Sequence, residues 1–406
     1  MTDQEIHDLG PAFAAYLARC RPDLGDIANV AHLRNYCRGL LADLPRKSVE
    51  PIALAAGACV RNLQQFLKAC DWDEAAVRDR TQRLLAAAAA DQPAGTAGTV
   101  GVIDETSCVK QGTKTPGVQR QYLGCVGKVQ NGVVTVHLAA ARGRFKCLLD
   151  GELYLPMSWD ADRDRCRAAG IPDEVTYRPM WLIALGLVAR AGSNGWGFDW
   201  LTFDEGYGGR PKFLRLLDVA GQRYVGEVPA TFRVRVGRGR VRVAARDAFA
   251  RRAVKAKAAR SFRLSQQTGP PAVWQVKQVR VCLGVDARPR HRLVVARNRE
   301  TGEVKYVVTN ARPGVGLKRV LAAAFARWQV EHVIRLAKSE VGLTHYEGRH
   351  YRGLMRHLVL CTLVLGFVAL HTERLRGEKP GPDPGAGVPG AEREVRRPLA
   401  ATAGVG

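Results

Sequence analysis

Apolar positions recur at intervals of three and four residues through the first part of the chain. The spacing is clear in AFAAYLARC, and TQRLLAAAAAD is rich in residues that favour helices. This pattern predicts a helical domain over residues 1–95. The stretch DQPAGTAGT (91–99) is rich in Gly, Pro and Thr, and it marks the predicted boundary with the next domain.

Two short helical patterns within this region are joined across Ala56 and Gly57, in SVEPIALAAGACVRNLQQFLKAC. The arrangement resembles a helix-turn-helix, with Val60 to Lys68 as the second helix. That helix would present four side chains to a DNA groove: Arg61, Asn62, Gln64 and Gln65. Two helices of an ordinary bundle explain the same pattern, so both interpretations stay open.

Beyond residue 96 the pattern becomes that of strands. TVGVID, QYLGCVGKV and GVVTVHLAAA are β-rich, and Gln130 to Gly132 is a hairpin-like connection between the last two. A helix at about 180–191, the strand WLTFD, a helix over KFLRLLDVA and the strand RYVGEVP follow. Strands interleaved with helices predict a mixed α/β sheet.

Residues of about 230–303 interrupt this alternation. They contain the Arg-rich TFRVRVGRGRVRVAARDAF and the alternating VWQVKQVRVCLG, which together predict an inserted, β-rich, positively charged subdomain. The sheet pattern returns at VKYVVTN, and a long helix is expected from Leu317 to about Val341. Residues 376–406 are rich in Pro and Gly and predict a disordered tail after a domain that spans 96–375.

Composition narrows the possible partners. The 406 residues include 62 Lys and Arg against 38 Asp and Glu, a formal net charge of +24. Such an excess favours a polyanionic partner, because each neutralised phosphate releases counterions. A merely basic soluble protein has the same balance, so charge alone does not decide.

The cysteines and the apolar runs exclude several classes. The ten cysteines form no CxxC pair, which argues against a zinc ribbon or a redox pair and favours free thiols in a reducing cytosol. The N-terminal MTDQEIHDLG lacks the pattern of a signal peptide. The run LVLCTLVLGFVAL (358–370) is too short to span a bilayer comfortably and predicts a buried core helix. We therefore expect no membrane partner.

Three acidic residues are the strongest candidates for chemistry. Asp104 ends the run TVGVID, Asp204 ends DWLTFD, and Glu331 lies on the predicted helix FARWQVEHVIRLAKSEVGL. Carboxylates from two strand ends and a helix can converge on hard divalent cations. Taken singly, each aspartate is as well explained by a turn cap, and Glu331 by a solvated helix face. Glu105 and Glu205 directly follow the aspartates, and strand alternation predicts that both point to the opposite side of the sheet.

Four segments carry a resemblance to a known family: IDETSCVKQGTKTPGVQRQYLG, ELYLPMSWDADRDRCRAAGIPDEV, FDEGYG and RWQVEHVIRLAKSEVGLTHYEGR. In this order they resemble the DDE transposases of bacterial insertion sequences, in the group with a Y-x2-R-x3-E-x6-K signature. The resemblance covers roughly residues 40–370. It implies an RNase H-like fold with an inserted β subdomain, and two Mg²⁺ ions, for which Mn²⁺ can substitute. It assigns the catalytic, metal-binding positions to Asp104, Asp204 and Glu331.

The signature is matched with one departure. Arg327 precedes Glu331 by four residues and Lys338 follows it by seven, whereas Ala324 occupies the tyrosine position. Helical spacing places the three charged residues on one face, so the two cations are expected to hold DNA phosphates near the metals. Phe325 is a speculative substitute for the missing ring. Lys110 and Lys114 follow the first aspartate and are further candidate DNA contacts, with exposed surface charge as the alternative.

The resemblance implies a cytoplasmic, nucleoid-associated bacterial transposase. Such an enzyme binds the terminal inverted repeats of its own element as double-stranded DNA, cleaves one strand, and joins the freed 3′-hydroxyl to target DNA. A homodimer on DNA is expected, because two ends must be joined. The alternatives are an inactive or domesticated DNA-binding derivative, which Ala324 favours, and an RNase H-like nuclease acting on other substrates.

Overall fold

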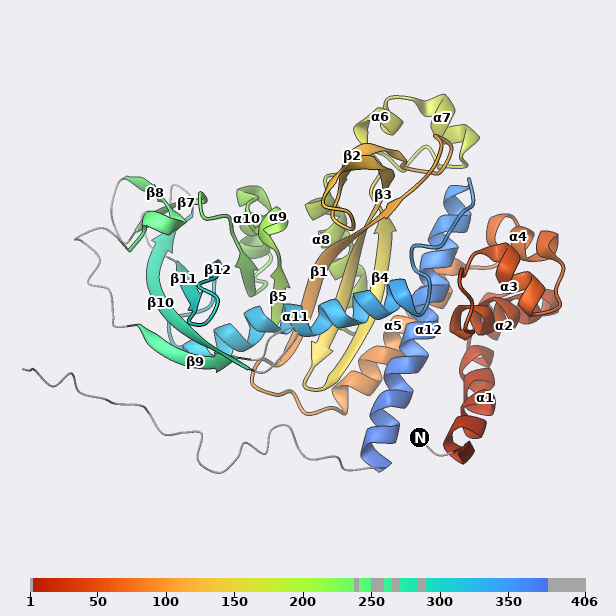
Figure 1. Ribbon diagram of the computed structural model, residues 1–406, viewed down its shortest axis with the longest axis horizontal. Helices are drawn as coiled ribbons and strands as arrows, with labels where there is room; N and C mark the ends of the chain where they lie inside the picture. The colour runs from red at the N-terminus through yellow and green to blue at the C-terminus, as the bar shows by residue number, and fades with distance from the viewer. Residues whose placement is uncertain (1–2, 237–240, 250–258, 265–270, 284–289, 379–406) are drawn as a thin grey trace, which may run out of the picture.

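The computed structural model describes residues 3–236, 241–249, 259–264, 271–283 and 290–378. Figure 1 shows one extended sheet with helices on both faces, a group of N-terminal helices at one side and a β-rich arm at the other.

The N-terminal residues form the helices expected from their apolar spacing. These are α1 (Asp3–Ala18), α2 (Ile27–Leu41), α3 (Val49–Ala55), α4 (Val60–Lys68) and α5 (Glu74–Ala90), with a short 3₁₀ helix at Arg21–Asp23. Two begin at aspartate caps: the Asp26 carboxylate accepts from the Ala28 N–H at 3.0 Å, and the Asp73 carboxylate from the Ala76 N–H at 2.9 Å. Helix α5 also packs on the sheet, so the helical region is in direct contact with the region that follows it.

A mixed sheet forms the centre of the molecule. Its main path runs β2-β3-β1-β5-β6-β12-β11-β10-β7-β8, with β4 paired to β3 and β9 to β10. The pairs β1·β5 and β5·β6 are parallel, and the other pairs are antiparallel. The expected mixed α/β sheet is confirmed. Its strands within the described residues are β1 (Thr99–Val109), β2 (Gln119–Leu123), β3 (Lys128–Arg142), β4 (Phe145–Leu153), β5 (Trp200–Phe203), β6 (Tyr224–Glu227), β7 (Arg233–Val236), β8 (Arg242–Ala244), β9 (Arg260–Leu264), β10 (Ala272–Cys282), β11 (His291–Asn298) and β12 (Val304–Thr309).

The predicted position of one hairpin turn is wrong. Strand β3 runs without a break through Gln130 and Gly132, and the turn that joins it to β2 lies earlier, at residues 124–127. Gly127 has φ of +65°, a conformation that a glycine adopts without strain. The earlier turn lets β3 pair along the full length of β1, from Thr99 to Val109.

The segment expected as an insertion is β-rich and continues the main sheet. Strand β11 pairs with β12, and β10 pairs with β11, β9 and β7. Figure 1 shows these strands as an arm that extends the sheet beyond β12. Whether this arm is a separate subdomain stays a prediction.

Helices cover both faces of the sheet and create two apolar clusters. Alternation along the strands sends Val100 and Val102 to one cluster, with α11 (Leu317–Ser339) and α12 (Tyr351–Glu378), and Ile103 to the other. The second cluster is completed by α5, α8 (Met180–Ser193) and α10 (Pro211–Val219). The short helices are α6 (Met157–Asp160), α7 (Arg163–Ala168) and α9 (Glu205–Gly208), with a 3₁₀ turn at Ala245–Asp247.

Helix α12 joins the N-terminal helices to the sheet (Figure 1). Its stretch Tyr351–Thr372 is long and apolar enough to cross a membrane, but 78% of the tested window is buried in the structure, as expected of a core helix. The Arg356 side chain, 0% exposed, donates to the carbonyls of Phe66, Cys70 and Trp72 at 2.6 to 3.0 Å, and pairs with Glu74 at 3.1 Å. The helix continues through Glu378, and the remainder of the predicted tail lies outside the described residues.

Candidate active site

Two acidic residues stand where parallel strands end, and a third lies beside them within a longer strand. Asp204 directly follows β5, and Glu227 is the last residue of β6. Asp104 lies within β1, which continues to Val109, so the expectation that it ends a strand is wrong. However, the parallel pairing of β1 with β5 stops at Val102–Thr202. The edge of β1 is therefore uncovered beside Asp104, and the acids meet there.

The aspartates are oriented by backbone N–H groups. An Asp204 carboxylate oxygen accepts from Gly206 N at 2.9 Å and from Tyr207 N at 3.4 Å, so Asp204 is the N-cap of α9. An Asp104 oxygen accepts from the N–H of Glu105 at 2.9 Å. The cap that the sequence offered as an alternative role for Asp204 thus coexists with its place in the acidic cluster, because each carboxylate keeps a second oxygen.

Glu105 also contributes to this cluster, although strand alternation sends its Cβ to the opposite side of the sheet from that of Asp104. One carboxylate oxygen each from Asp104, Glu105 and Asp204 lies within 4.8 Å of the others. Alternation along a strand sets the direction of Cβ only. The longer glutamate side chain still brings one carboxylate oxygen close to the two aspartates. Glu205, in contrast, is exposed.

Burial and repulsion from nearby carboxylates raise the pKa values of Asp104 and Glu105. Burial, followed by the nearby Asp204, raises the pKa of Glu105 to about 7. Burial also raises the pKa of Asp104 to about 6, although the Arg327 guanidinium opposes that rise. The buried Tyr207 lies beside them, and burial together with the charges of Glu105 and Asp104 raises its pKa well above its usual value.

Glu331 faces the cluster from α11 but is held by an arginine. Its carboxylate pairs with the Arg327 guanidinium at 2.6 Å, one helical turn away, and the other end of Arg327 lies 3.6 Å from Glu227. The Arg327 side chain is only 12% exposed. Lys305 in turn contacts Glu227 at 3.1 Å. Sequence reasoning missed Glu227, although the acidic end of the strand pattern RYVGEVP is its visible signal.

Glu340 and Lys338 lie further along the same helix. Glu340 is the C-cap of α11 and is exposed, and its backbone carbonyl accepts from Lys47. Lys338 is half-buried, and its charge helps to lower the pKa of the buried His137, the cross-strand partner of Asp104. The described structure therefore gathers Asp104, Asp204, Glu331 and Arg327, and it leaves Glu340 outside.

The alanine at the tyrosine position of the signature packs against the apolar core. Ala324 is half-buried among the apolar residues of α11 and its neighbours. The Phe325 ring packs against Trp274 at 5.3 Å and Trp328 at 4.5 Å, measured between ring centroids. Because it is buried in this aromatic group, Phe325 does not replace the tyrosine.

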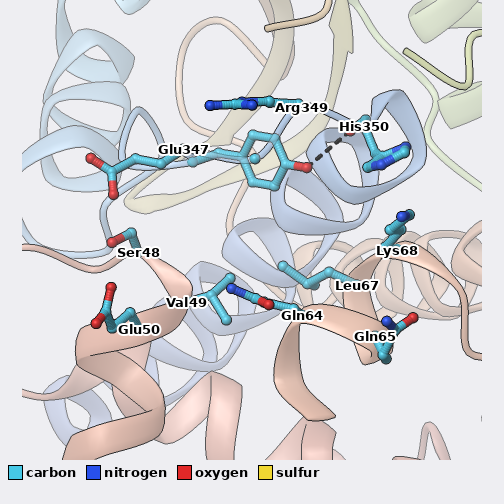
Figure 2. Close-up of a pocket in the computed structure, with 12 residues that line it drawn as sticks. Ser48, Val49, Glu50, Gln64, Gln65, Leu67, Lys68, Glu347, Arg349 and His350 are labelled. Carbon is cyan, nitrogen blue, oxygen red and sulfur yellow. Dashed lines mark hydrogen bonds between the residues drawn. The ribbon is translucent and has the colours of Figure 1, made fainter. Parts of the chain in front are cut away.

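The helix-turn-helix pattern is matched by α3, a turn at Ala56–Cys59 and α4. Gly57 in the turn has φ of +60°. Leu63, Phe66 and Leu67 are buried, whereas Arg61, Asn62, Gln64 and Gln65 are exposed. Figure 2 shows Gln64, Gln65 and Lys68 facing Glu347, Arg349 and His350 across a pocket of about 410 Å³.

The two lysines after the first aspartate differ. The Lys110 ammonium donates to the carbonyl of Thr344 at 3.3 Å and to that of Tyr346, so it ties β1 to the loop after α11. Lys114 is exposed. Only Lys114 therefore has the free surface position that a direct phosphate contact requires.

Comparison with known proteins identifies the family of the chain. Residues 21–299, more than half of the chain, match the family described as DDE superfamily endonuclease. The chain therefore belongs to the DDE endonuclease superfamily. The matched region contains Asp104, Glu105 and Asp204, and it ends before Glu331.

One curated relative agrees with this family. A protein of Microchaete diplosiphon named as a probable transposase for insertion sequence element IS701 is 31% identical over 189 residues, which are 46% of each chain. The chain spans about half the length of this relative. The resemblance to DDE transposases inferred from the sequence is confirmed at the level of the family.

Proposed function

We propose that this protein is a metal-dependent DNA transposase that cleaves and joins the ends of its own mobile element. The observation that carries this proposal is the convergence of Asp104, Glu105 and Asp204 beside Glu331, in a chain that belongs to the DDE endonuclease superfamily. Its net charge of +24 suits a polyanionic substrate.

The acidic cluster fits divalent cations. Its three oxygens within 4.8 Å come from carboxylates, the donors that Mg²⁺ and Mn²⁺ take in proteins. Asp104, Glu105 and Asp204 would hold the metal, with Glu331 as a further ligand. When bound, paired ions of this kind supply an activated attacking oxygen and a stabilised leaving oxygen in phosphoryl transfer.

The chain's own groups prepare the site for this chemistry. The backbone N–H groups of Gly206 and Tyr207 fix the Asp204 carboxylate, and that of Glu105 fixes Asp104. Arg327 holds the Glu331 carboxylate in an ion pair at 2.6 Å, and Glu331 would have to leave that pair to act as a metal ligand. The guanidinium would then be available to a DNA phosphate.

We assign DNA recognition to the exposed face of α4. Arg61, Asn62 and Gln64 carry side chains that hydrogen-bond to base edges in the major groove. Lys114 and, once released from Glu331, Arg327 would contact phosphates, with Lys338 near the site. Lys110 is assigned a positioning role instead. The ligands are the terminal inverted repeats and target DNA, and a homodimer would hold the two ends.

A cleavage assay tests this assignment. Asp104→Asn and Asp204→Asn keep the side-chain shape but remove a metal-binding charge, so cleavage of terminal-repeat DNA in Mg²⁺ should fall at least about a hundredfold. Affinity in a gel-shift assay should change less than about twofold. The matched control is Glu340→Gln, which removes an exposed carboxylate from the same helix as Glu331. Near wild-type cleavage by either aspartate variant would reject the metal site.

Ala324 favours a second candidate, a DNA-binding derivative that no longer cleaves. The substitution removes one presumed DNA contact, and Phe325 does not restore it. If the wild-type protein binds terminal repeats but does not cut them in Mg²⁺ or Mn²⁺, while Ala324→Tyr does, the second candidate is correct.

A further inference from the structure

We propose that the end of the sheet opposite the acidic cluster binds the phosphate backbone of a second DNA duplex. A pocket of about 930 Å³ lies there, lined by Arg215, Arg223, Arg290 and Arg312 together with Asp218 and His291. The choice of DNA as the ligand depends on the proposed function, but the pocket contains none of the residues of the acidic cluster.

The topology places this pocket away from the acids. Arg223 immediately precedes β6, and Glu227 ends it. Asn310 follows β12, which is antiparallel to β6, so it returns to the same end as Arg223. The four residues of β6 span roughly 13 Å. A duplex that contacts the acidic end would have to pass round the sheet to reach the arginines.

The pocket has a large excess of positive charge. Its only described acid, Asp218, already accepts from His291 at 2.9 Å and from Asn310 at 3.0 Å. Arg223 is paired with Asp199 at 3.1 Å, outside the pocket. Within the part of the chain that the structure describes, no ion pair involves Arg215, Arg290 or Arg312, and all three are exposed.

A buried arginine adds to the positive field. The Arg292 side chain donates to the carbonyl of Val315, which lines the pocket, at 3.0 Å. Arg292 is 7% exposed, and among the described residues no carboxylate pairs with it. Burial and the neighbouring Arg280 lower its pKa, as expected where positive charge lacks a counter-ion.

The chemistry of the lining selects a polyanion. Guanidinium groups bind phosphate through two parallel N–H bonds, and exposed arginines at the rim suit a backbone passing over the surface. A DNA-joining enzyme handles more than one duplex, so one can contact this surface while another lies at the acidic end. An acidic protein segment is the competing occupant, and the test below separates it from DNA.

The test measures binding of a 30-base-pair duplex without terminal repeats, in EDTA, by fluorescence anisotropy over a series of salt concentrations. The variant is Arg215→Gln with Arg312→Gln. Two lost phosphate contacts should reduce the slope of log affinity against log salt by roughly 1.8. Affinity at 100 mM salt should fall about tenfold. A Lys/Lys variant at the same positions keeps the charge and should retain most of the slope.

The matched control is Arg19→Gln with Arg21→Gln, two exposed arginines of the N-terminal helices. If the pocket variant changes slope and affinity no more than this control, the proposal is overturned. A surface that binds acidic protein and not DNA would give that result. The assay contains no metal and measures no cleavage. Its outcome is therefore independent of the Asp104→Asn test, and the two proposals can fail separately.

Discussion

The two ends of the sheet carry opposite charge and opposite kinds of order. At the acidic end, Asp104 and Glu105 are half-buried, and a backbone N–H group orients the Asp104 carboxylate. At the arginine end, Arg215 and Arg312 are exposed and have no ion pair among the described residues. Catalysis requires groups that are held in place, whereas binding a polyanion requires charged side chains that can adapt to it.

Substitution of Glu331 should have the largest effect, which is a loss of strand cleavage. Glu331→Gln removes the only α11 carboxylate that faces the cluster, so strand cleavage should fall at least about a hundredfold. Glu340→Gln removes an exposed carboxylate nine residues along and should leave cleavage within about twofold. The rates are measured side by side in Mg²⁺. The opposite ranking would move the active site to the other face of α11 and withdraw the role of Arg327.

Arg356 contrasts with the exposed arginines of the pocket, because its side chain is buried and fully paired. Arg356→Met removes one of the two arginines that pair with Glu74 and leaves several carbonyl groups at the end of α4 without their donor, and should lower the free energy of unfolding by about 3 kcal/mol. Arg215→Gln should lower it by less than about 0.5 kcal/mol, as expected of an exposed site. Urea titrations of both variants measure the difference. Equal losses would show that the Arg215 guanidinium is part of the packed structure.

Glu105 tests how far the acidic cluster extends. Glu105→Gln should reduce cleavage about tenfold or more and weaken Mn²⁺ binding, because one of the three clustered oxygens loses its charge. Glu205→Gln, at the equivalent position after the second aspartate, is exposed and should match wild type. If both variants cleave normally, Glu105 is only a neighbour of the metal ligands.

His357, at the junction of α12 with the N-terminal helices, affects the pH dependence of stability and not cleavage. Tyr36 donates to its ring at 2.9 Å, the other ring nitrogen donates to Gly342 at 3.0 Å, and burial lowers its pKa to about 4. The unfolded chain takes up the proton first, so stability is lost as pH falls from about 6.5 towards 4, by at most about 1.4 kcal/mol per pH unit. His357→Gln should flatten this slope in urea titrations. An unchanged slope would assign the acid sensitivity to other groups.

The sequence predicted the elements whose pattern is local. Apolar spacing located α4 at Val60–Lys68, and alternation with a terminal acid located β5 and Asp204. The turn between β2 and β3 was misplaced because a β-rich run has no internal mark of where pairing begins. The approach of the Glu105 carboxylate to the two aspartates was not predicted. It depends on where β5 stops beside β1, which is a property of the assembled sheet.

The arginine end was not predicted, because its residues are distant in sequence. Arg215 lies on α10, Arg223 before β6, and Arg312 after β12. Each is an ordinary surface arginine in its own segment. Only the strand order 5-6-12-11 brings them to one pocket. The ion pair of Arg327 with Glu227 was hidden for the same reason, although its pair with Glu331 follows from helical spacing.

Mn²⁺ binding in the absence of DNA shows directly whether the acidic end of the sheet holds the metal and the arginine end does not. Calorimetry would compare wild type, Asp204→Asn, and the Arg215→Gln, Arg312→Gln variant. Wild type and the arginine variant should bind Mn²⁺ with similar affinity, and Asp204→Asn should bind at least about tenfold more weakly. Equal affinity of Asp204→Asn and wild type would contradict the account.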